Sequence, residues 1–141
     1  MITSGFNICY IDTNILISRI SPEPNATSDI QTLGTIRAKE FTFLTSELTR
    51  LEVSRFIHRL NTNDSSSASI EKHVKDALAG IELIRLNNRT LEIAARFPFP
   101  HLGSLDSIHL ASAQMVGATH FLTRDRQLVT ACAELGIATT F

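Results

Sequence analysis

The sequence contains no long hydrophobic segment and no positively charged start. None of its apolar runs approaches the ~18 residues that a membrane-spanning helix requires, and residues 1–6 lack the basic stretch of a signal peptide. We therefore expect a cytoplasmic protein without a membrane partner. Cysteine is also scarce, because only Cys9 and Cys132 are present. We expect both to be buried small apolar side chains in a reducing compartment, rather than redox or metal-binding groups.

The chain also lacks a strong charge of either sign. Its formal net charge is −1 over 141 residues, which excludes an extended basic arm for nucleic acid but leaves room for local basic patches. Arginine, which forms bidentate contacts with phosphate, far outnumbers lysine. This bias weakly indicates a phosphate-bearing partner, although surface ion pairs explain it equally well. The length predicts one domain over residues 1–141.

What the sequence does contain is a regular alternation of strand and helix patterns. The run 8–11 is apolar without alternation, as in a strand of a parallel sheet that is covered on both faces. The complete pattern predicts a three-layer α/β/α sandwich around a mostly parallel sheet. We expect strands over 8–11, 41–44, 82–86, 121–123 and 137–140, and helices from 13 onward and over 27–39, 47–60, 68–79, 89–96, 105–116 and 126–135, with a polar loop over 61–67.

Three aspartates occupy similar places in this pattern. Asp12 directly follows the first strand, Asp106 lies in the first turn of a helix, and Asp125 immediately precedes the last helix. Ligands of open α/β sheets bind beyond the carboxyl ends of the strands. Helix capping explains any one of these aspartates. Several carboxylates that converge there would repel one another, however, and a Mg²⁺ or Mn²⁺ ion relieves such repulsion.

A fourth carboxylate comes from the helix predicted over 47–60. Glu47 and Glu52 are five residues apart and therefore point about 140° away from each other around the helix axis. Glu52 lies between Leu48 and Phe56 on an apolar face, whereas Glu47 belongs to the first turn, where a carboxylate interacts favourably with the helix dipole. We therefore expect Glu52, and not Glu47, to face the aspartates.

Other polar residues near these positions have two possible roles. His109 follows Asp106 by three residues and so lies on the same helix face, where it is either a metal ligand or, more commonly, a core histidine with satisfied hydrogen bonds. Four further polar side chains either orient carboxylates and bound water or cap helices, and these are Thr13, Asn14, Ser46 and Thr123.

Four segments of the chain resemble the motifs of the PIN-domain nucleases, in the same order and spacing. Their sequences are YIDTNILI (10–17), TSELTRLEV (45–53), LGSLDSIHLA (102–111) and LTRDRQL (122–128). The likeness is greatest to the VapC toxins of bacterial toxin–antitoxin pairs and extends over essentially the whole chain. The acidic quartet of the family corresponds here to Asp12, Glu52, Asp106 and Asp125, and its motif-associated polar residues correspond to Asn14 and Thr123.

This resemblance implies a PIN-like fold and an endoribonuclease that depends on Mg²⁺, with Mn²⁺ as a substitute, and leaves a 5′-phosphate and a 3′-hydroxyl. The quartet would supply both the catalytic and the metal-binding residues, with Asp12 and Asp106 as the main ligands. The implied partners are an RNA substrate, a second copy of the chain in a homodimer, and a cognate antitoxin whose C-terminal segment occupies the active-site groove. Four arginines near the motifs either contact the RNA backbone or form surface ion pairs, and these are Arg50, Arg55, Arg124 and Arg126.

Two other enzyme or signalling functions fit the sequence less well than a metal-dependent nuclease does. A phosphatase with an aspartyl nucleophile requires a second aspartate where this chain has Asn14, and a phospho-receiver domain requires a lysine after a late strand, where none occurs. A non-catalytic PIN scaffold would have a broken quartet, which the sequence does not show. A PIN nuclease that processes RNA or cleaves DNA flaps would use the same residues and stays open.

Overall fold

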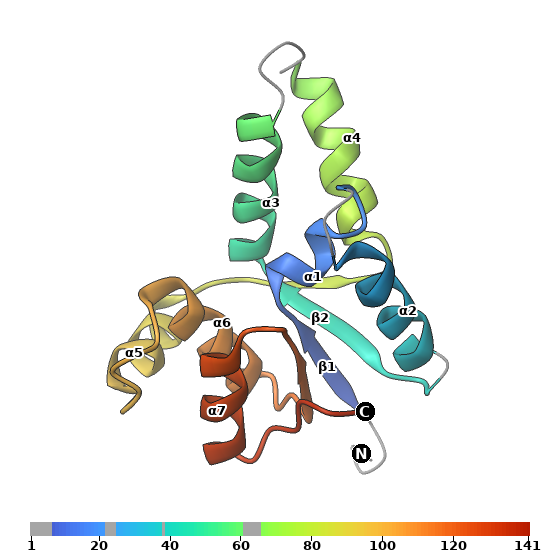
Figure 1. Cartoon of the computed structure of the whole chain (residues 1–141). Helices are drawn as coiled ribbons and strands as arrows, with labels where there is room; N and C mark the ends of the chain where they lie inside the picture. The colour runs from blue at the N-terminus through green and yellow to red at the C-terminus, as the bar shows by residue number, and fades with distance from the viewer. Residues whose placement is uncertain (1–6, 22–24, 38, 61–65) are drawn as a thin grey trace, which may run out of the picture.

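The computed structural model describes residues 7–21, 25–37, 39–60 and 66–141 (Figure 1). Residues 61–65 of the predicted loop lie outside this range, whereas Ser66 caps the helix that begins at Ser67. The elements in chain order are β1 (Ile8–Ile11), α1 (Thr13–Ile17), α2 (Ala26–Arg37), β2 (Thr42–Ser46), α3 (Glu47–Leu60), α4 (Ser67–Leu78), β3 (Glu82–Ile84), α5 (Asn88–Arg96), α6 (Ser104–Met115), β4 (His120–Leu122) and α7 (Arg126–Glu134).

The four strands form one sheet in the order β3-β2-β1-β4, and every neighbouring pair is parallel. Strand β1 is therefore central, with Tyr10 opposite Leu44 of β2 on one side and Phe121 of β4 on the other. The backbone N–H of Asp12 extends this ladder by donating to the carbonyl of Leu122 at 3.0 Å. The first residue of the predicted quartet is thus fixed by the sheet itself.

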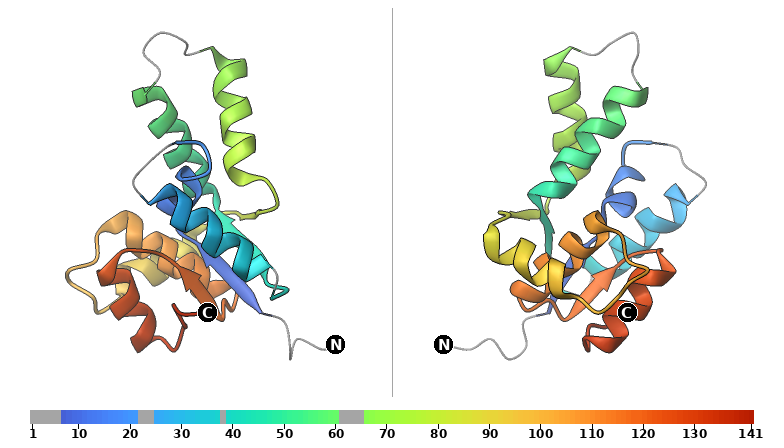
Figure 2. Two further views of the ribbon diagram at one scale, coloured as in Figure 1. Left: turned by 45° about the vertical axis from the view of Figure 1, so that its right-hand side comes forward. Right: turned by 90° about the vertical axis from the view of Figure 1, so that its left-hand side faces the viewer.

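Successive side chains of β1 enter two different cores, as the pleat of a strand requires. Cys9 and Ile11 pack among apolar residues of α1 to α4, whereas Tyr10 packs with Leu110 of α6 and Leu128 of α7. Helix α5 lies beside α6 on this second side (Figures 1 and 2). Both faces of the sheet are therefore covered, which confirms the predicted three-layer α/β/α arrangement around a parallel sheet.

The predicted final strand over 137–140 is wrong. Only Ala138 bridges to His120, through hydrogen bonds between Ala138 and the carbonyl of Thr119 at 3.0 Å and between Phe121 and the carbonyl of Ala138 at 2.9 Å. The ladder stops there because the ring of Phe141 stacks on that of His120, with centroids 5.1 Å apart. Packing of the C-terminal aromatic ring thus replaces further strand pairing.

The expected burial of the two cysteines is confirmed. Cys9 and Cys132 are both buried and have free thiols. Burial raises the pKa of each thiol to about 12, which leaves almost no reactive thiolate at neutral pH. Among the described residues, no helix combines the length and the apolar character needed to cross a membrane.

Candidate active site

Asp12 lies at the carboxyl end of β1, where it also forms the N-cap of α1. Its Oδ1 accepts a hydrogen bond from the backbone N–H of Thr13 at 2.9 Å, and its Oδ2 accepts one from the hydroxyl of Thr123 at 2.8 Å. The side chain is nearly buried, with 5% of the residue exposed. Burial raises the pKa of this carboxyl and outweighs the stabilising effects of His109 and Thr123. Two hydrogen bonds therefore hold the carboxylate of Asp12 in place, although burial makes its negative charge unfavourable.

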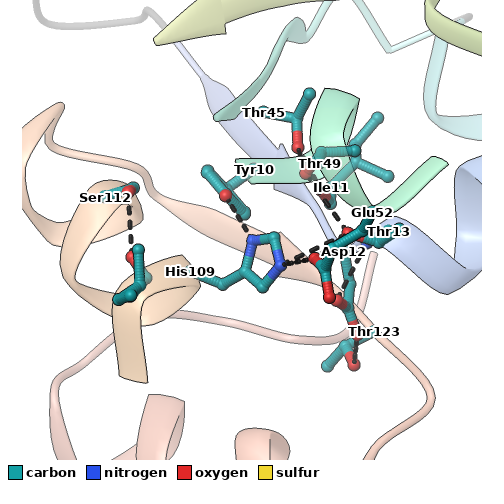
Figure 3. A network of polar contacts seen from close by, with 11 residues as sticks. Tyr10, Ile11, Asp12, Thr13, Thr45, Thr49, Glu52, His109, Ser112 and Thr123 are labelled. Carbon is teal, nitrogen blue, oxygen red and sulfur yellow. Dashed lines mark hydrogen bonds and ion pairs between the residues drawn. The ribbon is translucent and has the colours of Figure 1, made fainter. Parts of the chain in front are cut away.

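Glu52 reaches the same region from α3 (Figure 3). Its Oε1 accepts hydrogen bonds from the hydroxyl of Thr13 at 2.7 Å and from Nε2 of His109 at 2.6 Å. Burial by itself would raise the pKa of Glu52, but the hydrogen bond and charge of His109 and the Thr13 hydroxyl lower it. Glu47 instead forms an exposed ion pair with Arg50 at 3.3 Å. The two glutamates thus point where the helical period predicts.

Asp106 and Asp125 belong to the first turn of α6 and to the N-cap of α7, respectively. Asp106 is half-buried, and its pKa is raised by burial and by the negative charges of Asp12 and Asp125, with a smaller contribution from Glu52. Asp125 is exposed, and its Oδ1 accepts hydrogen bonds from two backbone N–H groups of α7 at 2.8 and 3.1 Å. The four carboxylates therefore share one electrostatic field, while Asp125 also caps a helix.

His109 is a core residue with both ring nitrogens paired, as the more common of its two predicted roles requires. Only 1% of the residue is exposed. Nδ1 lies 2.6 Å from the hydroxyl of Tyr10, and Nε2 lies 2.6 Å from Oε1 of Glu52. Neither nitrogen retains a free lone pair for a metal in this arrangement. Sequence reasoning did not single out Tyr10, although a hydroxyl on a strand covered on both faces needs a buried partner.

Known proteins resemble this chain in sequence and in fold. The PIN domain family model matches residues 9–133, which is most of the chain. The chain belongs to the PIN-domain family. It is 32% identical to the protein named Ribonuclease VapC35 of Mycobacterium tuberculosis over 135 residues, which cover 92% of this chain and 93% of that relative.

Solved structures show the same fold as this PIN domain. VapBC2 from Rickettsia felis, bound to a DNA fragment from its promoter, matches with a TM-score of 0.67 and 15% identity over 94% of this chain and 96% of the other. A toxin–antitoxin complex from Klebsiella pneumoniae matches with a TM-score of 0.64 and 22% identity over the same shares. At these identities the likeness establishes the fold alone.

An ion pair between an exposed arginine and a buried aspartate joins the quartet side of this PIN domain to α2. Arg124 donates from Nε to Oδ1 of Asp29 at 3.1 Å, and its Nη2 lies 3.0 Å from Oδ2. Asp29 is 4% exposed, and Nη2 of Arg124 also donates to the carbonyl of Asn14 at 3.4 Å. Arg124 is thus an ion-pair partner here, and the Asn14 residue that it contacts is exposed.

The remaining predicted residues are distributed as follows. Thr123 orients Asp12, as one of its two expected roles requires, and its hydroxyl oxygen also accepts from the N–H of Asp125 at 3.0 Å. Ser46 directly precedes α3. Three of the arginines near the motifs lie on exposed positions, one of them paired with Glu47, and these are Arg50, Arg55 and Arg126.

The donor set of this PIN domain suits a hard cation. Carboxylate oxygens are the ligands that Mg²⁺ and Mn²⁺ prefer. The pKa of Asp106 is raised first by burial and then by the charges of Asp12 and Asp125, and a dication would relieve that second effect, the repulsion between carboxylates. Within the described part of the chain, no three His, Cys, Asp or Glu side chains form a ready cage around one ion. This fits Mg²⁺, which uses one or two carboxylates and retains several waters.

Proposed function

We propose that this PIN domain is a metal-dependent endoribonuclease and the toxin of a type II toxin–antitoxin pair. The observation that carries the proposal is the shared field of Asp12, Glu52, Asp106 and Asp125 at the carboxyl end of the central strands. The 32% identity to a protein named a ribonuclease, over nearly the full length of both chains, supports RNA as the substrate. RNA as substrate implies that the protein acts in the cytoplasm.

Asp12 and Asp106 would be the main ligands of Mg²⁺, with Mn²⁺ as a substitute, and Glu52 and Asp125 would complete the site or position a water. When bound, such an ion activates water and stabilises the charge that develops on phosphate and the leaving oxygen. The chain's own contribution is orientation. The Thr13 N–H and the Thr123 hydroxyl fix Asp12, which leaves its remaining lone pairs available.

Removal of divalent metal is expected to abolish RNA cleavage. Within the described part of the chain, this region presents carboxylates and no serine or cysteine paired with a histidine, so hydrolysis is expected to depend on metal-activated water. Activity on a labelled single-stranded RNA should disappear in EDTA and return when Mg²⁺ or Mn²⁺ is added in excess. A DNA flap substrate in the same assay tests the alternative specificity. Undiminished cleavage in chelator would overturn the metal requirement.

The protein is expected to form a homodimer and to bind an antitoxin. The Klebsiella pneumoniae structure with the same fold is a toxin–antitoxin complex, and the α3 helix of this chain exposes two large apolar side chains, Leu51 and Leu60, at 57% and 59%. Sedimentation equilibrium should give twice the chain mass. Pull-down from the host should recover a small protein that inhibits cleavage at an equimolar ratio. A monomer at every concentration, with no inhibitory partner, would contradict this assignment.

A further inference from the structure

A buried polar path connects the central strand to Glu52. The ring of Tyr10, which is fully buried, stacks on Phe121 with centroids 5.0 Å apart, so its hydroxyl is fixed in the core. That hydroxyl lies 2.6 Å from Nδ1 of His109, and Nε2 of the same ring lies 2.6 Å from Oε1 of Glu52. Figure 3 shows the three side chains in line from β1 through α6 to α3.

The proton between His109 and Glu52 follows from the chemistry of the carboxylate. An ionised carboxylate can only accept hydrogen bonds, so Nε2 of His109 carries a proton and donates this hydrogen bond to Glu52. Nδ1 is paired with the hydroxyl of Tyr10, which acts as donor to a neutral ring and as acceptor from a charged one. In both forms the ring is held between Tyr10 and Glu52, and Glu52 is the acceptor at the end of the path.

A second donor reaches the same oxygen of Glu52 from beside the His109 ring, because the Thr13 hydroxyl lies 3.2 Å from Nε2 of His109. The hydroxyl of Thr13 donates to Oε1 at 2.7 Å, while its neighbours Thr49 and Thr45 form their own bonds, ending at the carbonyl of Ile11. Both described hydrogen-bond donors to Glu52 thus donate to Oε1. Among the described residues, Oε2 receives no hydrogen bond and is free for another ligand.

A role in packing alone does not account for this arrangement. Apolar residues at positions 10 and 109 would fill the same core without any buried polar atom to satisfy, whereas the observed chain places a tyrosine and a histidine there and pairs their polar atoms with each other and with Glu52. Glu52 has several rotatable bonds and is only partly buried, with 28% of its side chain exposed. Its carboxylate would sample many positions if these donors were absent.

We propose that His109 and Tyr10 are positioning residues, which hold the Glu52 carboxylate by Oε1 so that Oε2 is presented to the other carboxylates of the quartet. The consequence for catalysis rests on the proposed nuclease function. The positioning itself concerns atoms of the metal-free chain and can be tested without any substrate.

The first test is ¹⁵N NMR of the histidine rings in the metal-free protein. Wild type should show a protonated Nε2 of His109 and an Nδ1 signal shifted by the hydrogen bond with Tyr10. Tyr10→Phe removes one oxygen and should move the Nδ1 signal toward the value of a nitrogen without this hydrogen bond. Glu52→Gln should move the Nε2 signal instead. If neither substitution changes the His109 signals, the positioning chain does not exist, whatever the protein catalyses.

The second test measures Mn²⁺ affinity by calorimetry, together with kcat and KM for RNA. Loss of a group that orients a ligand typically costs about 10- to 100-fold in metal affinity or activity. His109→Asn cannot reach Glu52 and should show this loss in Mn²⁺ affinity and kcat with KM unchanged. His109→Gln places an amide N–H near the position of Nε2 and should recover part of it, and Tyr10→Phe should show a smaller loss.

The matched control is Leu110→Val, which disturbs the same helix and the core cluster that contains Tyr10 but removes no polar atom of the path. It should lower thermal stability and leave Mn²⁺ affinity unchanged. Equal losses for His109→Asn, His109→Gln and Leu110→Val would show that position 109 acts only through packing. If RNA is not cleaved by wild type, the proposed function fails, while the NMR and Mn²⁺ measurements still decide the positioning role.

Discussion

Replacement of Asp12 by asparagine is expected to abolish RNA cleavage and, in metal-free buffer, to make the folded protein more stable. The first effect follows from the loss of a ligand charge. A bound ion contributes several kcal/mol to transition-state stabilisation, so its loss should reduce the rate by about 10³-fold or more. The second effect follows from burial, because the carboxylate of Asp12 carries a charge in a nearly closed environment.

The stability effect should depend on pH with a definite sign. Folding raises the pKa of Asp12 above its ordinary value of 3.8, so the folded state binds this proton more tightly than the unfolded state. Protonation of Asp12 therefore stabilises the folded state relative to the unfolded state. This contribution is complete below pH 3.8 and is lost as the pH rises through the folded-state pKa. Asparagine does not titrate, and it retains the shape and capping ability of aspartate. The advantage of Asp12→Asn should accordingly be small near pH 4 and larger at pH 7.

Thermal unfolding in EDTA and in Mn²⁺, at both pH values, measures these effects. A difference of about 1 kcal/mol would shift the midpoint by roughly 3–5 °C in a chain of this length. Mn²⁺ should raise the midpoint of wild type and have little effect on Asp12→Asn. Glu92→Gln, an exposed change on α5 that also removes one charge, is the matched control and should behave as wild type. Wild-type cleavage by Asp12→Asn would overturn its assignment as a ligand.

The second large effect should separate the two glutamates of α3. Glu52→Gln removes the charge that receives the bonds of Thr13 and His109, so most of the nuclease activity should be lost and Mn²⁺ binding weakened, by about 10- to 100-fold each. Glu47→Gln breaks only the exposed pair with Arg50, and such pairs contribute little to stability. It should leave both properties nearly intact.

The two glutamine variants form a matched pair, because the same chemical change is made on one helix at positions that face different ways. Cleavage rate and Mn²⁺ affinity, measured side by side with the unfolding midpoint, distinguish loss of the site from loss of the fold. A variant ranking in which Glu47→Gln is the more damaged would refute the placement of Glu52 in the site.

Local patterns were sufficient to place most of the site. Asp12 could be predicted because a short apolar run defines a strand end, and the helical period alone distinguished Glu52 from Glu47. The length of α3, Glu47–Leu60, also follows from its pattern of apolar residues. These features depend on neighbours a few residues away, which the sequence displays directly.

Long-range pairing could not be predicted in the same way. The partners Tyr10 and His109 are 99 residues apart, and Arg124 and Asp29 are 95 residues apart, so only the three-dimensional fold brings each pair together. The predicted strand over 137–140 failed for a related reason. Its β propensity is local, but pairing was limited by the stacking of Phe141 on His120, a contact between distant parts of the chain.

The central position of β1 has a consequence for the order in which the molecule is made. Strand β1 leaves the ribosome well before β4, which is one of its two neighbours in the sheet but lies at the other end of the order of strands in the chain. Thr123, which fixes Asp12, and Asp125 directly follow that strand. A nascent chain that ends before β4 therefore cannot hold Asp12 as the finished domain does. Closure of the sheet depends on a non-local pairing, and the growing polypeptide has no complete quartet until β4 and the residues that follow it have been added.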